Sequence, residues 1–128
     1  MSERYLRGVE ILQRLHGNPL EKVTNAVAEI APDFARMTIE FPFGDLYSRT
    51  AACLRTREIA AVSALAVLGA HPQLRVHIEA ARSAGCTREE LIEILMQVSI
   101  YAGFPAALNA LAACHDLLAT QPQAQAAE

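Results

Sequence analysis

The stretch PQLRVHIEAARSAGCTREELIEILMQVSIYAGFPAALNAL, residues 72–111, decides the fold because helix starts and helix stops follow one another closely in it. Pro72 suits the first turn of a helix, and Gly85 suits the left-handed position just after its end. Thr87 and Glu90 then have the spacing of a capping box, which starts the next helix. The stretch therefore predicts consecutive helices joined by short connections.

The helices on either side of this stretch follow from the same signals. The capped helix is expected to run to about Tyr101, where Gly-Phe-Pro at 103–105 separates it from a last helix that ends near Ala119. Residues 56–69 are polar at the start and apolar almost all round afterwards, which is typical of a helix buried on most sides. The pattern predicts that 56–69 and 72–84 form a helical hairpin at the centre of the core.

The first third of the chain also has helical patterns. Ser2 is expected to cap a helix over about 3–16, and Pro19 to open another that ends near Ile30. Asp33 is expected to cap a short helix that ends near residue 41. The segment FPFGDLYSRT, residues 41–50, contains Pro and Gly and is predicted to be a loop.

Length and composition favour one helical domain. The chain has 128 residues, 52% hydrophobic but only 5% aromatic, and no segment alternates long enough for a strand. Such an interior of Ala, Leu, Ile and Val favours close helix–helix packing. We expect an all-α, compact single domain over residues 1–120 and a flexible tail at 121–128. The apolar excess also suggests surface that is covered in an oligomer.

The charge and the cysteines exclude several classes of protein. A net charge of −3 gives no general attraction to nucleic acid or to anionic membranes. The longest apolar run, residues 59–70, is too short to span a bilayer, and the charged N-terminus is unlike a secretory signal. We therefore expect a soluble cytoplasmic protein. Three scattered cysteines without a C-x-x-C motif indicate reduced thiols, and no constellation of metal ligands stands out.

Three segments carry a resemblance to a known family: FGDLYSR at 43–49, LRTRE at 54–58 and the long stretch at 72–111. Together they resemble the carboxymuconolactone decarboxylases of the alkylhydroperoxidase-like superfamily, over most of the chain from Tyr5 to Leu118. The resemblance implies an all-α helix bundle that assembles as a homo-oligomer built on dimers, often a hexamer, with a trimer as the other possibility.

The peroxidase branch of that superfamily carries a glutamate, a C-x-x-C pair and a histidine. These positions fall on Glu58, on Ala70 and Gln73, and on His77. Neither alanine nor glutamine can attack a peroxide, so thiolate chemistry is excluded at that place. The chain also has Thr-Ala-Ala at 50–52, where the decarboxylases commonly have a Pro-Gly pair.

The resemblance implies cofactor-independent loss of CO₂ from 4-carboxymuconolactone, or a similar carboxylated lactone, to the enol-lactone in aromatic catabolism. His77 would be the general acid or the donor to the developing oxyanion, because imidazole gains and loses a proton near neutral pH. Glu58 would orient or charge that ring. Without the resemblance, His77 would be read as a structural histidine, and Glu58 as half of a pair with Arg55 in the first helical turn.

A dianionic substrate also needs cations and donors around it. The candidates for substrate binding are four arginines, two tyrosines as hydrogen-bond donors and one phenylalanine as an apolar wall: Arg49, Arg55, Arg57, Arg75, Tyr47, Tyr101 and Phe104. Each arginine has an ordinary alternative as a surface or interface ion pair, and Tyr101 as a core residue.

Two other functions remain open from the sequence. A peroxide reductase would use Cys53, Cys86 or Cys114 in place of the lost pair. A non-catalytic helical oligomer would bind a metabolite without turning it over.

Overall fold

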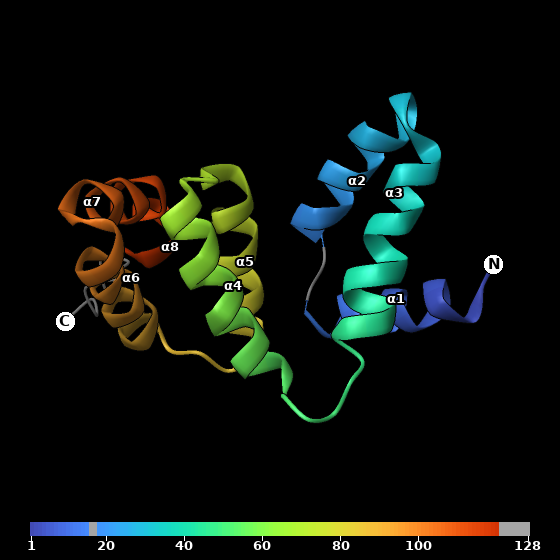
Figure 1. Cartoon of the computed structure of the whole chain (residues 1–128), viewed down its shortest axis with the longest axis horizontal. Helices are drawn as coiled ribbons and strands as arrows, with labels where there is room; N and C mark the ends of the chain where they lie inside the picture. Colours follow the sequence, from blue (N-terminus) through green and yellow to red (C-terminus); the bar gives the residue numbers. More distant parts are fainter. Residues whose placement is uncertain (16–17, 121–128) are drawn as a thin grey trace, which may run out of the picture.

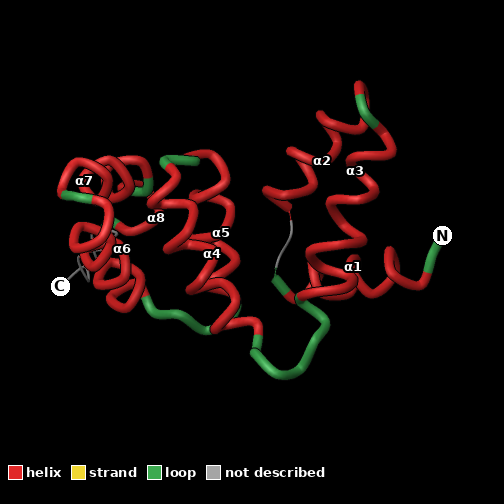
Figure 2. The backbone as a smooth tube through the Cα atoms, in the orientation of Figure 1, coloured by secondary structure: helices red, strands yellow, loops and turns green. Residues whose placement is uncertain are grey.

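The computed structural model describes residues 1–15 and 18–120, except for the side chains of 18–23, and it is helical throughout (Figures 1 and 2). No strand occurs within these ranges, so the all-α fold class is confirmed. The elements are α1 (Glu3–Arg14), α2 (Asn18–Ile30), α3 (Pro32–Ile39), the π-helix η1 (Glu40–Leu46), α4 (Leu54–Leu68), α5 (His71–Ser83), α6 (Arg88–Ala102), α7 (Phe104–Ala113) and α8 (His115–Leu118).

The larger hydrophobic core lies among α4 to α8. The expected helical hairpin is present: α4 and α5 pack along each other, and α6 and α7 pack against α4. Small and branched side chains fill this core because the chain has few aromatic residues. Its buried members are Val62, Ala66, Leu74, Ile78, Ala81, Cys86, Leu91, Leu95, Val98, Ala110, Cys114 and Leu118.

A smaller core joins the first part of the chain to this bundle. Ile11 and Leu15 at the end of α1 and Phe43 of η1 are buried against Ala80 of α5. The face of α5 that turns toward α1 is therefore covered by α1 and η1. By contrast, α2 and α3 pack mainly against each other and extend away from the bundle (Figure 1).

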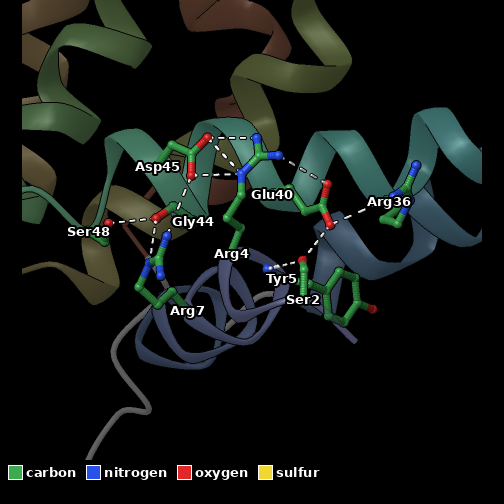
Figure 3. Close-up of polar contacts among 9 residues, drawn as sticks. All are labelled: Ser2, Arg4, Tyr5, Arg7, Arg36, Glu40, Gly44, Asp45 and Ser48. Carbon is green, nitrogen blue, oxygen red and sulfur yellow. Dashed lines mark hydrogen bonds and ion pairs between the residues drawn. The ribbon is translucent and has the colours of Figure 1, made fainter.

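Polar contacts between α1 and η1 hold this first part together (Figure 3). The hydroxyl of Ser2 accepts a hydrogen bond from the Tyr5 amide, as expected for a cap, and donates to the buried carboxylate of Glu40 at 2.6 Å. Arg4 donates three hydrogen bonds to the Asp45 carboxylate, two from Nε and one from Nη2, at distances between 2.7 and 3.1 Å. The α1–η1 pair is thus bridged by charged groups as well as by apolar contacts.

The local signals in the central stretch predict the structure correctly. Gly85 has a φ of 103°, and Pro72 lies in the first turn of α5. Both hydrogen bonds of the capping box between Thr87 and Glu90 are present at 3.1 Å. These features depend on a few neighbouring residues, so interactions within one helical turn are enough to produce them.

The expected loop at 41–50 is wrong for residues 41–46 and correct for 47–50. Its first residues continue the helical path of α3 as η1, where the Tyr47 amide donates to the Pro42 carbonyl in the wider π-helical spacing. Pro42 has no N–H to donate, and the wide turn accommodates its ring. Gly44 lies within this helix, and α1 approaches it so closely that a Cβ there would overlap the Arg4 carbonyl. Only residues 47–53 connect η1 to α4 without helix.

Three further expectations need correction. Asp33 is not a cap: α3 begins at Pro32 with Ala31 before it, and Asp33 lies in the first turn. The last helix is interrupted at Cys114, so α7 and α8 replace one helix to Ala119. Helix α4 is not buried on most sides, because one of its faces is open in the single chain. The expected end of the first helix at residue 16 and the tail at 121–128 lie outside the described residues.

Candidate functional site

Helices α4 and α5 bring Glu58 and His77 together. Glu58 lies in the second turn of α4 and His77 in the middle of α5, and the two helices run side by side as the central hairpin. The two side chains meet across this hairpin although they are 19 positions apart in sequence. The structure therefore places the predicted acid–base pair in direct contact.

The contact between the two groups is short and largely enclosed. Nδ1 of His77 lies 2.7 Å from Oε2 of Glu58, whose side chain is fully buried, whereas the His77 side chain keeps 14% of its surface exposed. A carboxylate can only accept a hydrogen bond, so Nδ1 carries the hydrogen and donates the hydrogen bond to Glu58. The contact fixes the orientation of the ring through Nδ1, which leaves Nε2 as its other ring nitrogen.

The second oxygen of Glu58 is an exception among buried polar atoms. Oε1 is buried and has no well-oriented hydrogen-bond donor within the described ranges. Buried oxygens are normally satisfied, and exceptions are typical of functional positions. Tyr47 lies close enough that burial, first, and the Glu58 carboxylate, second, raise the pKa of its hydroxyl.

Tyr47, which precedes α4, and Arg57, in the first turn of α4, extend the site. The Tyr47 ring meets Phe43 edge to face, with ring centroids 5.0 Å apart, and Arg57 lies over the same ring at 5.9 Å from the guanidinium carbon to the centroid. The Arg57 side chain also donates to the carbonyl of Ala52 at 3.1 Å. Arg57 is therefore a cation near the Glu58–His77 pair, held by a cation–π contact.

The other three predicted arginines are placed differently. Arg49 is exposed beside Arg57, whose guanidinium reaches its carbonyl at 3.5 Å. Arg55 pairs with Glu90 at the start of α6. Arg75 donates to both carboxylate oxygens of Asp116 at 2.6 and 2.8 Å. These hydrogen bonds raise the pKa of Arg75 and pair its charge with Asp116 on α8. Arg57 thus lies against Tyr47, the neighbour of Glu58, whereas Arg55 and Arg75 pair with carboxylates of α6 and α8.

Tyr101 and Phe104 do not close over the pair within one chain. Tyr101 near the end of α6 and Phe104 at the start of α7 are both largely exposed. Tyr101 lies at the edge of a groove between α4 and α6, which also includes Ile59 next to Glu58. Within a single chain Phe104 does not form the expected wall, and the exposed Tyr101 is not a core residue.

Comparison with known proteins now adds to this geometry. Residues 32–116 match the model of the carboxymuconolactone decarboxylase family, which is more than half of the chain and includes both Glu58 and His77. The chain belongs to this family. The match starts at α3 and ends in α8, so α1 and α2 precede it.

Two relatives show how far the similarity to known proteins extends. The chain is 29% identical over 110 residues to the 4-carboxymuconolactone decarboxylase of Acinetobacter baylyi, covering 85% of this chain and 82% of that protein. It is 30% identical over 100 residues to an uncharacterized 15.0 kDa protein from the nqo9-nqo10 intergenic region of Paracoccus denitrificans, covering 77% of this chain and 75% of that protein.

The thiols of this family member lie in unlike surroundings. Cys86 and Cys114 are buried, and burial raises the pKa of both. Cys53 is exposed at the start of α4, where hydrogen bonding, first of all to the Thr56 side chain, lowers its pKa. The positions of the peroxidase pair, Ala70 and Gln73, lie at the start of α5.

Two charged residues have roles that the sequence reasoning missed. Glu90 was expected only as a capping residue, and it also holds Arg55. Glu40 is buried among α1, α3 and η1, and the signal for it was an acidic residue inside the apolar run TIEFPF.

No three His, Cys, Asp or Glu side chains within 1–15 and 18–120 come together as metal ligands. No helix in those ranges has the length and apolarity needed to cross a membrane.

Proposed function

We propose that the chain catalyses the cofactor-independent decarboxylation of 4-carboxymuconolactone, or of a closely similar carboxylated lactone, to the enol-lactone. The observation that carries the proposal is the 2.7 Å contact between the buried Glu58 carboxylate and the partly exposed His77 ring. Membership of the family and the named relative from Acinetobacter baylyi support the same reaction class.

The chemistry needs a proton donor and a site for negative charge. When the carboxylate leaves as CO₂, the electron pair of the broken C–C bond moves through the conjugated double bond onto the lactone carbonyl oxygen. The resulting enolate then takes one proton at a ring carbon and becomes the neutral enol-lactone ring. Each turnover therefore releases one CO₂ and consumes one proton, and the lactone itself supplies the electron sink.

His77 and Glu58 match the proton-transfer step. With Nδ1 donating to Glu58, Nε2 of the imidazolium is the atom that delivers the proton to carbon. The buried carboxylate compensates the positive charge of the ring before the transfer and keeps its orientation afterwards. The small exposed fraction of His77 gives a substrate access to the ring while most water is kept away.

Arg57 and Tyr47 match the needs of the substrate's negative groups. Arg57 supplies a fixed cation for the carboxylate that is retained, and its cation–π contact with Tyr47 holds it in place. The Tyr47 hydroxyl is kept protonated by its raised pKa, so it can donate to the developing oxyanion. Arg49 lies beside Arg57 and is the second candidate for a carboxylate contact.

The direct test supplies purified protein with the carboxylated lactone and follows CO₂ and the enol-lactone. We expect turnover in the wild type and a loss of about 10²- to 10⁴-fold in His77→Ala, the range for removal of a general acid. His71→Ala, which changes a histidine at the start of the same helix, is the matched control and keeps full activity. Undiminished turnover in His77→Ala would contradict the role of that residue.

The peroxide reductase alternative rests on one observation, the exposed Cys53 with its lowered pKa. It requires oxidation of a thiol by peroxide in every cycle, and Cys53→Ser must then abolish the activity. The metabolite-binding alternative requires that the lactone raises the melting temperature without being converted. The lactone assay therefore separates decarboxylation from binding without turnover, and a peroxide assay of the wild type and Cys53→Ser tests the reductase.

A further inference from the structure

Tyr47 takes its position from the helix that precedes it. It directly follows η1, and its amide donates to the Pro42 carbonyl at 2.8 Å, so its backbone continues the wide turn of that helix. The position of the tyrosine therefore depends on how η1 is held. The helix that packs along η1 is α1, and α1 lies before residues 32–116, the part that matches the family model.

Two arginines on one face of α1 reach the last turn of η1 (Figure 3). Arg4 makes its three hydrogen bonds with the Asp45 carboxylate through Nε and Nη2. Arg7 donates from Nε to the Gly44 carbonyl at 3.2 Å, and its Nη2 lies 3.7 Å from Oδ1 of Asp45. A guanidinium that binds a carboxylate through two of its nitrogens fixes direction as well as distance. The residues just before Tyr47 are thus held against α1.

The Gly44 carbonyl extends this hold to the residue after Tyr47. It accepts the hydrogen bond from Arg7 and a second one, at 2.7 Å, from the hydroxyl of Ser48 (Figure 3). The backbone of α1 also lies so close to Gly44 that it leaves no room for a Cβ. The chain is therefore fixed to α1 on both sides of Tyr47.

Apolar contacts fix the ring of Tyr47 as well. Side chains at the end of α1 are buried together with Phe43, and the Tyr47 ring and Val76, the neighbour of His77, pack against this small core. Phe43 meets the Tyr47 ring edge to face at 5.0 Å. The hydroxyl at the other end of the ring lies close enough to the Glu58 carboxylate for the two groups to interact.

The position of this hydroxyl matters because the carboxylate beside it has an oxygen to spare. Oε2 of Glu58 accepts from His77 at 2.7 Å, whereas Oε1 is buried without a well-oriented donor in the part of the chain that the structure describes. Buried oxygens gain from a hydrogen-bond partner. A shift of Tyr47 toward Oε1 would pair its hydroxyl with Glu58 and withdraw it from a substrate.

We propose that Arg4 and Asp45 are positioning residues for Tyr47: their contact sets η1 on α1 so that the Tyr47 hydroxyl stays available to the substrate beside Glu58. Arg7 supports the same setting through the Gly44 carbonyl. The role rests on the decarboxylation proposed above, in which Tyr47 donates to the developing oxyanion. Arg4 and Asp45 act through the tyrosine and not on the substrate.

Steady-state kinetics with the carboxylated lactone tests the effect on the reaction. Arg4→Gln and Asp45→Asn each remove one charge of the pair with little change of volume. Because the oxyanion contact exists only in the transition state, each variant should lower kcat and kcat/KM by the same factor and leave KM nearly unchanged. We expect about a tenfold loss, since a displacement of about 1 Å costs up to about 10²-fold.

A double variant and a matched control accompany these measurements. Arg4→Gln combined with Asp45→Asn should lose no more activity than Asp45→Asn alone, because both changes break the same contact. Arg14→Gln removes an exposed arginine at the other end of α1 and should keep wild-type kinetics. Losses of kcat that multiply in the double variant would overturn the proposal.

A background without the Tyr47 hydroxyl separates positioning from a general loss of structure. Tyr47→Phe lowers kcat itself, and Arg4→Gln added to it should cause no further loss of kcat. Urea denaturation should show the same loss of unfolding free energy from Arg4→Gln in both backgrounds. If Arg4→Gln lowers kcat by the same factor with and without the hydroxyl, Arg4 acts on the fold alone and the proposal is overturned.

A signal from Tyr47 tests the positioning independently of the reaction. In protein labelled with ¹³C at the tyrosine Cζ atoms, the NMR signal of Tyr47 at neutral pH is the one that disappears in Tyr47→Phe. It should shift in Arg4→Gln and Asp45→Asn and stay in place in Arg14→Gln. An unchanged signal would overturn the positioning even if the lactone is converted. Shifted signals in a protein that never converts the lactone would support the positioning and count against the proposed reaction.

Discussion

Oε2 of Glu58 accepts a hydrogen bond from Nδ1 of His77 at 2.7 Å, across the interface of α4 and α5. The carboxylate is fully buried while the imidazole retains some exposed surface. A buried polar group normally needs a partner, and here the His77 ring is in hydrogen-bond contact with the carboxylate. The geometry therefore couples the orientation of the ring to Glu58, and the proposed proton transfer would use this coupling.

Replacement of Glu58 by glutamine tests this coupling. Glu58→Gln keeps the volume and a hydrogen-bond acceptor but removes the negative charge that compensates the imidazolium. We expect turnover of the lactone to fall by about 10²-fold or more, with a smaller change in KM. The measurement is steady-state kinetics as a function of pH, and Glu79→Gln on the exposed side of α5 is the control. An unchanged kcat and pH profile in Glu58→Gln would contradict the coupling.

Tyr47 is expected to resist ionisation in the folded protein. Burial and the neighbouring Glu58 raise its pKa above the ordinary value of 10.0. Since the unfolded chain then loses this proton first, stability is lost as the pH rises above about 10. Tyr47→Phe removes this part of the alkaline decline, which urea denaturation at pH 9 and pH 11 can measure. An equally steep decline of the unfolding free energy in wild type and Tyr47→Phe would contradict this role of Tyr47.

The three cysteines are expected to differ in reactivity. Cys53 is exposed and has a lowered pKa, whereas Cys86 and Cys114 are buried with raised pKa values. A thiol reagent near neutral pH should therefore modify one cysteine rapidly and the other two only on unfolding. Cys53→Ser should lose the rapid phase. Rapid modification of two thiols in the folded wild type would contradict this assignment.

Gly44 is expected to be essential for the packing of α1 on η1. A Cβ at this position would overlap the backbone carbonyl of Arg4, and backbone cannot move aside as a side chain can. Gly44→Ala should lower the free energy of unfolding by about 1–3 kcal/mol, the range for overpacking. Gly69→Ala provides a contrast, since a Cβ there meets open space and only the left-handed backbone opposes it. Equal stability of Gly44→Ala and wild type would contradict the close approach.

Arg75 holds Asp116 in its ionised form. The hydrogen bonds from Arg75 lower the pKa of Asp116 from 3.8 to about 2. The pair therefore stabilises the fold above about pH 4, and this contribution is lost as the pH falls toward 2. In Arg75→Gln the pKa should return toward its ordinary value, which carboxyl NMR titration can follow. A pKa that stays near 2 without Arg75 would assign the effect to another group.

Much of the helical pattern was predictable because it depends on close neighbours. The capping box of Thr87 and Glu90 and the left-handed Gly85 need only residues within the same turn. The pairing of α4 with α5 follows from two apolar helices joined by two residues, Gly69 and Ala70. These features are local, so a single sequence is enough to predict them.

The errors occurred where distant segments overruled local preference. Residues 41–46 contain a proline and a glycine and look like a loop, yet packing against α1 makes them helical. The burial of α4 was overestimated because its sequence is apolar on the side that the single chain leaves open. For the candidate site, Glu58 and His77 were identified by resemblance, and whether they would touch depended on the rotation of two helices.

By itself, the sequence determined the helical class and the helix ends in the central stretch, because these depend on spacing within one or two turns, whereas the residues of the candidate site came from the family resemblance. Only the tertiary structure decided that His77 meets Glu58, that Arg57 turns toward Tyr47 and that Arg75 turns to Asp116. The direction of a side chain is set by how its helix rotates against its neighbours, and that rotation is a property of the whole core.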